Sequence, residues 1–162
     1  MCSDLGGPIN KVAYLFATTN LAVTNVGSLK VMAAVMAAGM VPPLAMALSA
    51  TLRPNLYQPA ERENGTAAWL LGASFISEGA IPFAAADPLR VIPSMMAGGA
   101  VTGALSMALG AASKAPHGGI FVFFAIDRGW AFILAIVVGT IVAALLVPIF
   151  QASAKRKAEA TA

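Results

Sequence analysis

Cysteine, histidine and charged residues are all scarce in this sequence, and each scarcity excludes a class of function. The single cysteine, Cys2, permits neither an internal disulfide nor a redox pair. One cysteine and one histidine are too few ligands for a zinc cluster, so we expect neither a bound metal nor a cofactor. The sequence has no Gly-rich loop ending in Gly-Lys-Ser or Gly-Lys-Thr and no evident Ser/His/Asp set, which argues against direct use of ATP and against a serine hydrolase.

Apolar residues dominate the sequence and form long runs without charge. Only 10% of the 162 residues are charged and 59% are hydrophobic, with a mean hydropathy of +0.80. Three uncharged runs, at 31–52, 91–113 and 129–154, hold 22, 23 and 26 residues. A helix needs roughly 20 apolar residues to cross a bilayer, so each run is long enough to span. The sequence therefore predicts an all-α, polytopic transmembrane protein.

The net charge of +3 comes largely from Lys155, Arg156 and Lys157, which follow the last apolar run. Because short basic flanks mark the cytoplasmic side of a membrane, we expect residues 151–162 to form a basic cytoplasmic tail. The other seven cations are scattered among apolar segments, which argues against nucleic-acid binding. The N-terminus does not have the pattern of a signal peptide and reads as internal to a larger protein.

Polar residues and prolines interrupt the apolar segments in three places. Residues 12–29 are rich in Thr and Asn, so we expect this segment to face other helices or a wet cavity. Pro42 and Pro43 fall near the middle of the first long run and predict a break or a kink there. Residues 53–65, with two prolines and four charges, predict the clearest loop of the chain.

A discontinuous element is expected in the middle of the chain. Residues 66–77 and the stretch to Ala86 are apolar but too short to span a bilayer, and a Gly/Pro break at 78–82 separates them. A second break at 114–119 precedes another short apolar piece, at 120–126. Irregular backbone at membrane depth is tolerated where it is buried in protein or lines a cavity. The break at 78–82 is therefore the best candidate for a binding site among re-entrant short helices.

Small residues recur in the run at 91–113. Gly99 and Gly103 form a Gly-x-x-x-Gly pair, a spacing that lets helix backbones approach closely in membranes. We therefore expect this helix to pack closely against a neighbour through these two residues.

Glu78 is an isolated carboxylate between two apolar pieces, with its nearest cation in sequence 12 positions away at Arg90. An intramembrane carboxylate is costly unless it is paired or hydrated, so Glu78 is a candidate binding residue. The alternative is a helix-end carboxylate at the level of the lipid headgroups. Because Gly79 and Pro82 break the helix there and free backbone groups for a ligand, the functional interpretation is favoured.

Two further positions carry polar groups beside breaks. His117 can donate and accept hydrogen bonds, which suits a sugar hydroxyl or a proton relay, and its alternative is a polar loop residue at the membrane surface. Asn10 and Lys11 follow a flexible Gly-Gly-Pro turn at the start of an apolar segment. Lys11 is interpreted as an interface lysine in preference to a ligand contact.

Asp87 has a structural interpretation that competes with a role in binding. Asp is favoured at helix N-caps and Pro at the first helical position, so Asp87 and Pro88 predict the start of the next helix. Arg90 lies three residues further on and can pair with Asp87.

Three stretches together resemble the fructose-specific IIC component, the permease domain, of the bacterial phosphoenolpyruvate-dependent sugar phosphotransferase system. They are Leu5-Gly-Gly-Pro-Ile-Asn-Lys-Val-Ala-Tyr14, Ile76-Ser-Glu-Gly-Ala-Ile-Pro-Phe-Ala-Ala-Ala-Asp-Pro-Leu-Arg-Val-Ile-Pro93 and Lys114-Ala-Pro-His-Gly-Gly-Ile-Phe121. The second is the most specific. Because IIC domains are longer than this chain, the resemblance implies that residues 1–150 are the C-terminal half of such a domain.

The resemblance implies a homodimeric permease in the bacterial inner membrane that takes up fructose or a related sugar. The permease presents the sugar to a cytoplasmic IIB domain, which donates a phosphoryl group from a cysteine. Cys2 lacks the IIB pattern around it, so this chain carries no phosphoryl acceptor of its own. In the wider superfamily a glutamate in a re-entrant region binds sugar hydroxyls, and the match falls on Glu78, with Ser77 where Thr is commoner. The candidate substrate-binding residues are Glu78, His117, Asn10, Asp87 and Arg90.

Two other functions remain open on the residues alone. In a proton- or ion-coupled secondary transporter, Glu78 and His117 would relay protons in place of holding a sugar. In a membrane assembly subunit without transport activity, the small-residue faces would pack against a larger partner. The sugar-binding interpretation differs from both in requiring Glu78 at the wall of an enclosed, ligand-sized space.

Overall fold

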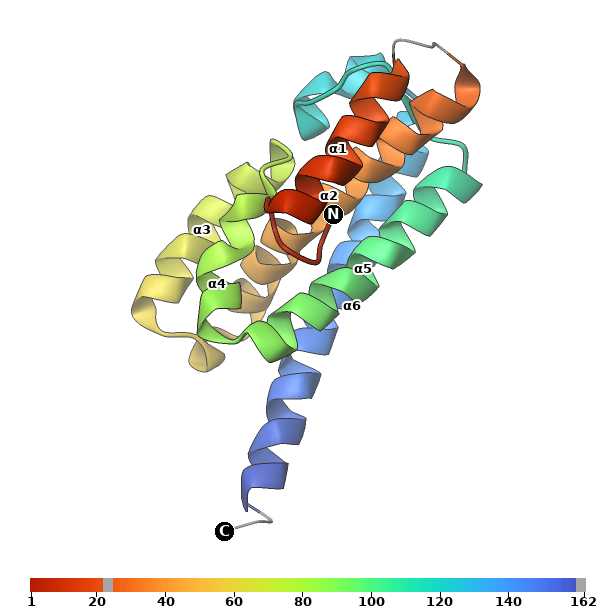
Figure 1. Cartoon of the computed structure of the whole chain (residues 1–162). Helices are drawn as coiled ribbons and strands as arrows, with labels where there is room; N and C mark the ends of the chain where they lie inside the picture. Colours follow the sequence, from red (N-terminus) through yellow and green to blue (C-terminus); the bar gives the residue numbers. More distant parts are fainter. Residues whose placement is uncertain (22–24, 160–162) are drawn as a thin grey trace.

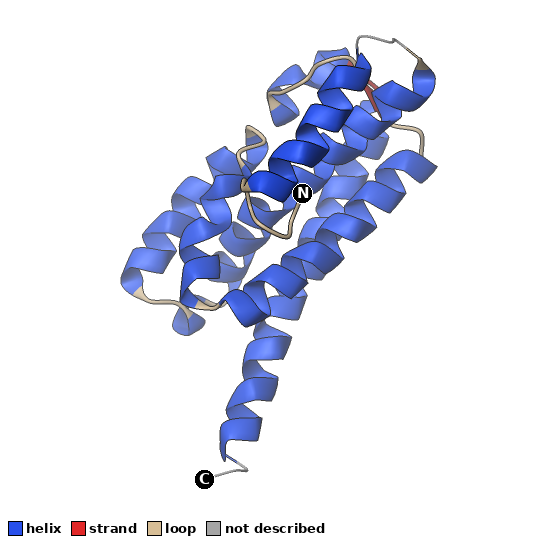
Figure 2. Cartoon of the chain, viewed as in Figure 1, coloured by secondary structure: helices blue, strands red, loops and turns tan. Residues whose placement is uncertain are grey.

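The chain folds into a helical bundle, which a computed structural model describes for residues 1–21 and 25–159, with side chains up to Phe150 (Figures 1 and 2). The α-helices of this part are α1 (Pro8–Leu21), α2 (Val26–Leu52), α3 (Pro59–Ala73), α4 (Ile81–Ala86), α5 (Pro88–Ala108) and α6 (Gly129–Glu159). The short 3₁₀ helices are η1 (Pro54–Leu56), η2 (Ser77–Ala80) and η3 (Gly119–Ala125). Two two-residue strands, β1 (Ala112–Ser113) and β2 (Ile126–Asp127), pair antiparallel and bracket η3. The predicted all-α class is confirmed.

Three helices are long and apolar enough to cross a membrane, and they are the three that the uncharged runs predict. They are α2, α5 and the Gly129–Phe150 part of α6. Helix α2 lies at the centre, because it contacts α1, α3, α5 and α6, and 72% of its most apolar window is buried. Helix α6 extends beyond the other helices at its C-terminal end (Figure 1).

Pro42 and Pro43 do not break α2, so the predicted break is wrong. Each proline lacks an N–H, which removes the helical donor for the carbonyl four residues earlier, at Ala38 and at Gly39. Both freed carbonyls accept a hydrogen bond from another segment. The Cys2 thiol donates to the Ala38 oxygen at 3.2 Å, and the Ser77 hydroxyl donates to the Gly39 oxygen at 2.8 Å. The helix therefore continues because tertiary contacts replace the two missing backbone bonds.

The predicted loop at 53–65 is shorter than expected, since α3 begins at Pro59. Proline is favoured at the first helical position, and the Glu61 carboxylate accepts a hydrogen bond from the Gln58 N–H at 2.7 Å. The remaining loop is fastened to α2 by Tyr57, whose hydroxyl lies 2.6 Å from the Ser49 hydroxyl. Proline and charge in this stretch thus mark a helix start as well as a loop.

The polar segment at 12–29 divides between the end of α1 and the start of α2; Thr24 lies outside the described residues. Several of its polar side chains bond to their own helix, whereas Tyr14 lines a cavity, so the expectation of contact with other helices or a wet cavity holds only in part. The Asn20 side-chain amide donates to the Phe16 carbonyl at 2.6 Å, and Asn25 caps α2 by accepting from the Ser28 N–H at 2.8 Å. Local bonding satisfies these groups without a partner helix.

Helices α5 and α6 cross at Gly98 and Gly139, and not at the predicted pair Gly99 and Gly103. A Cβ atom at Gly98 would lie 2.6 Å from the Gly139 carbonyl oxygen, and one at Gly139 would overlap with the Thr102 hydroxyl. Gly99 instead faces the Cys2 sulfur, and Gly103 has nothing within 4 Å of such a position. Glycine is therefore required at the crossing one residue earlier than the motif indicates.

We predict that Gly98→Ala lowers the free energy of unfolding by about 1–3 kcal/mol, because the added methyl group meets backbone that cannot move away. Gly103→Ala makes the same chemical change in open space and is expected to be neutral or slightly stabilising. Denaturant titration of both variants in detergent micelles measures the difference. Equal effects of the two substitutions would contradict the assigned crossing point.

Candidate sugar-binding site

Three segments that are far apart in sequence border a small, partly open cavity of about 150 Å³. One is the N-terminal turn with the first part of α1, another is the break between α3 and α4, and the third is the turn before η3. The residues that line the cavity are Gly6, Asn10, Lys11, Tyr14, Phe75, Ser77, Glu78 and His117. Each of the three stretches that carry the family resemblance contributes at least one of them.

The N-terminal turn is held to α1 by Asp4. Its carboxylate accepts hydrogen bonds from the Ile9 N–H at 2.6 Å and the Asn10 N–H at 3.0 Å, which satisfies free donors of the first helical turn. A Cβ atom at Gly7 would lie 2.7 Å from the same carboxylate. The buried Asn10 side chain donates to the Met1 carbonyl at 2.8 Å. Asn10 thus fixes the turn as well as lining the cavity.

The break after α3 is positioned by contacts with α2 and with the turn at 117–119. Phe75 has a left-handed backbone with φ of 66°, and its side chain is buried against Gly39. Ser77 binds the Gly39 carbonyl as described above. At Gly119, with φ of 58°, a Cβ atom would overlap with the Ala73 carbonyl, so glycine allows the turn to press against the end of α3.

Glu78 lies beside Gly6 at the cavity wall. The Glu78 Oε1 atom is 2.6 Å from the position that a Gly6 Cβ would take, and the φ of 104° at Gly6 favours glycine at this position. Within residues 1–21 and 25–150, no hydrogen bond or ion pair engages the Glu78 carboxylate. Glu78 is exposed, and it borders the recess that the three segments form. A carboxylate in that position can accept hydrogen bonds from a guest.

Aromatic rings line the same space. The His117 and Phe75 ring centres are 5.1 Å apart, and Tyr14 meets His117 edge-on with 6.4 Å between ring centres. Tyr14 also lies 6.1 Å from Phe75. Such a cluster offers an apolar surface beside polar groups, a combination that fits the C–H faces and hydroxyls of a sugar.

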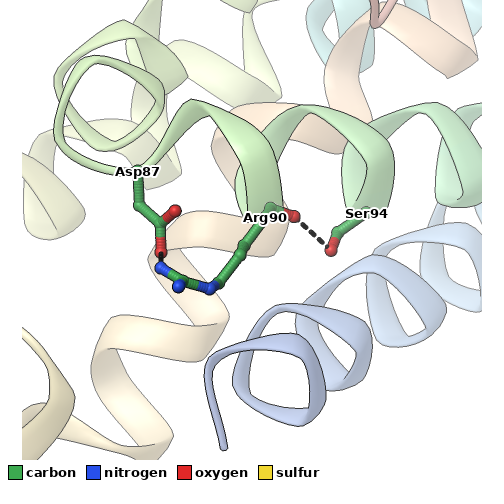
Figure 3. Close-up of polar contacts among 3 residues, drawn as sticks. All are labelled: Asp87, Arg90 and Ser94. Atoms are coloured by element: carbon green, nitrogen blue, oxygen red, sulfur yellow. Dashed lines mark hydrogen bonds and ion pairs between the residues drawn. The ribbon is translucent and has the colours of Figure 1, made fainter. Parts of the chain in front are cut away.

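Three of the five predicted site residues, Asn10, Glu78 and His117, therefore line one cavity. Asp87 and Arg90 are not among its lining residues. Asp87 precedes α5 and its carboxylate accepts from the Arg90 guanidinium at 2.7 Å, while the Ser94 hydroxyl donates to the Arg90 carbonyl (Figure 3). The predicted helix start at Pro88 and the pairing of Asp87 with Arg90 are confirmed, but the Asp87 side chain makes no capping hydrogen bond, so that part of the prediction is wrong.

Sequence reasoning missed several lining residues. Lys11 was interpreted as an interface lysine, although it shares the cavity with Glu78. Ser77 was noted only as a variation of the family motif, and its bond to α2 follows from the Pro42-Pro43 pair. Nothing in the local sequence marks Phe75 or Tyr14, because their role depends on segments that meet only in the fold.

Cys2 lies outside this cavity. The thiol is buried against Ala38, and burial raises its pKa to about 11, so it is neutral at physiological pH and a weak nucleophile. Among the described residues, no group of three or more His, Cys, Asp or Glu side chains gathers in a way that could hold a metal ion.

Comparison with known proteins finds relatives that are named as fructose-specific components of a phosphotransferase system or as a fructose permease component. The chain is 53% identical over 148 residues to the "PTS system fructose-specific EIIB'BC component" of Escherichia coli (strain K12), which covers 90% of the chain and 26% of that protein. It is 53% identical over 146 residues to the "PTS system fructose-specific EIIC component" of Haloferax volcanii, covering 90% of the chain and 38% of the relative. It is 43% identical over 157 residues to the "Fructose permease IIC component" of Bacillus amyloliquefaciens, covering 97% and 50%.

These alignments confirm the resemblance that the three motifs indicate. The chain spans between about a quarter and a half of the length of these relatives. No family model matches the chain. No solved structure matches it.

We predict that Ser77→Ala weakens ligand binding at this cavity, with fructose as the probe, although Ser77 need not contact the ligand. The substitution leaves the Gly39 carbonyl buried without a donor, which costs about 1–3 kcal/mol, and it releases the segment that positions Glu78. Ser77→Thr keeps the hydroxyl and is expected to restore binding. Equilibrium binding of radiolabelled fructose measures both variants, and equal affinity for alanine and threonine variants would rule out the anchoring role.

We predict that Asp87→Asn and Arg90→Gln leave fructose affinity within about twofold of the parent, because their ion pair lies outside the cavity. Each substitution is expected to lower the free energy of unfolding by at most about 1 kcal/mol, since the pair is partly exposed. The same binding assay and a denaturant titration test this. A large loss of fructose affinity with unchanged stability would instead show that both residues belong to the binding site.

Proposed function

We propose, since this chain belongs to the fructose-specific IIC family of the sugar phosphotransferase system, that it forms part of a permease that carries fructose or a related sugar across a membrane. Carriage is coupled to phosphorylation of the sugar by a separate IIB domain. The observation that supports this most directly is the position of Glu78, a carboxylate without a protein partner among the described residues, at the wall of a small cavity.

The lining of the cavity suits a polyhydroxylated guest. The Glu78 carboxylate accepts charge-assisted hydrogen bonds from two sugar hydroxyls, and these bonds are stronger than hydrogen bonds between neutral groups. The Asn10 side chain and the His117 ring add neutral polar groups that can bond to further hydroxyls. The rings of Phe75 and Tyr14 cover the apolar face of the sugar.

The size of the cavity favours a small sugar. At about 30 Å³ per water molecule, its 150 Å³ corresponds to about five waters. Pockets for drug-sized ligands measure about 300–1,000 Å³. A monosaccharide fits this scale better than an oligosaccharide.

Phosphorylation supplies a reason for the sugar to leave. A hydroxyl oxygen of the sugar forms the new O–P bond while the S–P bond to the donor cysteine breaks, the bonding pair stays on the sulfur as a thiolate, and the hydroxyl proton passes to that thiolate through water. The product carries about −1.5 to −2 charge at neutral pH. The like charge of Glu78 then repels it, so the group that binds the neutral sugar disfavours the product.

The assembly and orientation follow from the same proposal. The permease lies in the bacterial inner membrane as a homodimer, and its basic C-terminal end, from residue 151, faces the cytoplasm, where the IIB domain works. Glu78, His117 and Asn10 bind the sugar. Asp87 and Arg90, which the sequence also nominated, hold the start of α5.

We predict that Glu78→Gln raises the Kd for fructose at least about tenfold, because replacing a charged acceptor removes about 1.5–3 kcal/mol of hydrogen-bond energy. The measurement is fructose binding and uptake by a chimera in which this chain replaces the aligned segment of the Escherichia coli relative. Glu63→Gln, at an exposed position of α3 that does not line the cavity, is the matched control.

Unchanged affinity and uptake in Glu78→Gln would overturn the proposed sugar site. Uptake that persists in vesicles without a phosphoryl donor and collapses with the proton gradient would overturn the coupling and support a proton-coupled transporter instead.

A further inference from the structure

Lys11 is the one positively charged residue among those that line the cavity, and it shares this space with Glu78. It lies in the first turns of α1, one residue after Asn10. The nearby Asp4 carboxylate is engaged by the backbone N–H groups of Ile9 and Asn10 and forms no ion pair with Lys11. Lys11 is thus an exposed cation at the border of the cavity that forms no ion pair.

The cavity thus has one unpaired charge of each sign. The ion pairs found among the described residues join Arg90 to Asp87 and Lys114 to Asp127. Lys11 and Glu78 are in neither pair, so their charged atoms lie more than 4.0 Å apart. Opposite charges that border one cavity without meeting leave room for a guest between them.

We propose that Lys11 forms a phosphate subsite of this cavity, which binds the phosphoryl group carried by the sugar after its phosphorylation. A phosphomonoester offers three acceptor oxygens and about two negative charges, and an ammonium group donates up to three hydrogen bonds. Lys11 therefore favours the phosphorylated sugar, whereas Glu78 favours the neutral one. Lys11 thus raises the affinity of the site for the product, and Glu78 raises its affinity for the substrate.

Other cations of the described chain are less suited to this role. The guanidinium of Arg90 is bound to Asp87, and the amine of Lys114 to Asp127. The Arg128 guanidinium donates to the Leu109 carbonyl at 3.1 Å. Lys30 is on α2 and does not line the cavity, which makes it a suitable control.

This inference rests on the proposed function, and the two can fail separately. The proposed function requires Glu78 for binding of neutral fructose. The phosphate subsite requires Lys11 for binding of a phosphomonoester. If binding requires Glu78 but not Lys11, the proposed function is supported and the phosphate subsite is contradicted.

The experiment compares Lys11→Met, Lys11→Arg, Glu78→Gln and the control Lys30→Met in the chimeric permease. The probes are fructose, fructose 1-phosphate, fructose 6-phosphate and inorganic phosphate, each added as a competitor of bound radiolabelled fructose. Using both sugar phosphates covers either position of the phosphoryl group. Inorganic phosphate separates a site for the sugar phosphate from a general anion site.

We predict that Lys11→Met weakens binding of at least one sugar phosphate by roughly tenfold or more relative to its effect on fructose binding. Lys11→Arg keeps the charge and should retain most of the sugar-phosphate affinity. Glu78→Gln should have the opposite signature, with weaker fructose and tighter sugar phosphate. Lys30→Met should resemble the parent with every probe.

Three results would overturn the subsite: unchanged sugar-phosphate affinity in Lys11→Met, an equal loss for fructose and sugar phosphate, or a loss in Lys11→Arg as large as in Lys11→Met. Competition by inorganic phosphate as strong as by the sugar phosphates would show a free-anion site and equally contradict the proposal. The thermal unfolding midpoint reports whether Lys11→Met folds. If it does not fold, Lys11→Arg is compared with the parent across salt concentrations. A binding charge predicts that the affinity of both proteins for the sugar phosphate falls as salt rises.

Discussion

Two carbonyl groups of α2 organise the rest of this structure. Pro42 and Pro43 remove the N–H donors that the oxygens of Ala38 and Gly39 would have within the helix. A buried carbonyl without a donor is costly, so these oxygens create two fixed attachment points at the centre of the bundle. Cys2 occupies one and Ser77 the other. A feature that weakens an isolated helix thus holds two non-helical segments in place.

Those two segments carry the site. The Cys2 contact brings the N-terminal turn, and with it Gly6, Asn10 and Lys11, to the side of α2 on which Ser77 holds the break between α3 and α4. Glycine then allows close approach of the Glu78 side chain at Gly6 and of the Ala73 backbone at Gly119. The cavity is the space left between segments whose positions are set by hydrogen bonds and by the absence of side chains.

The two charges at this cavity differ from the charges that form ion pairs in the described chain. Arg90 with Asp87, and Lys114 with Asp127, form ion pairs at the ends of structural elements, where they stabilise a helix start and a turn. Glu78 and Lys11 border a shared space without pairing. Partnered charges serve the fold, whereas charges that the fold leaves unpartnered at a cavity are available to a ligand whose own charge changes during the reaction.

The sequence by itself determined the all-α membrane class, the three helices long enough to span a membrane, an interruption near Glu78 and the resemblance to the fructose-specific IIC family, because hydrophobic run length and short motifs are local properties. It also nominated Asn10, Glu78 and His117, since a lone polar group beside a helix break is recognisable without coordinates. Only the tertiary structure decided that α2 continues through Pro42 and Pro43, that the close helix crossing uses Gly98, and that Lys11 faces the site while Asp87 and Arg90 do not. These outcomes depend on which groups from distant segments satisfy a freed carbonyl, fill a gap or neutralise a charge, and sequence spacing carries no information about partners that meet only after folding.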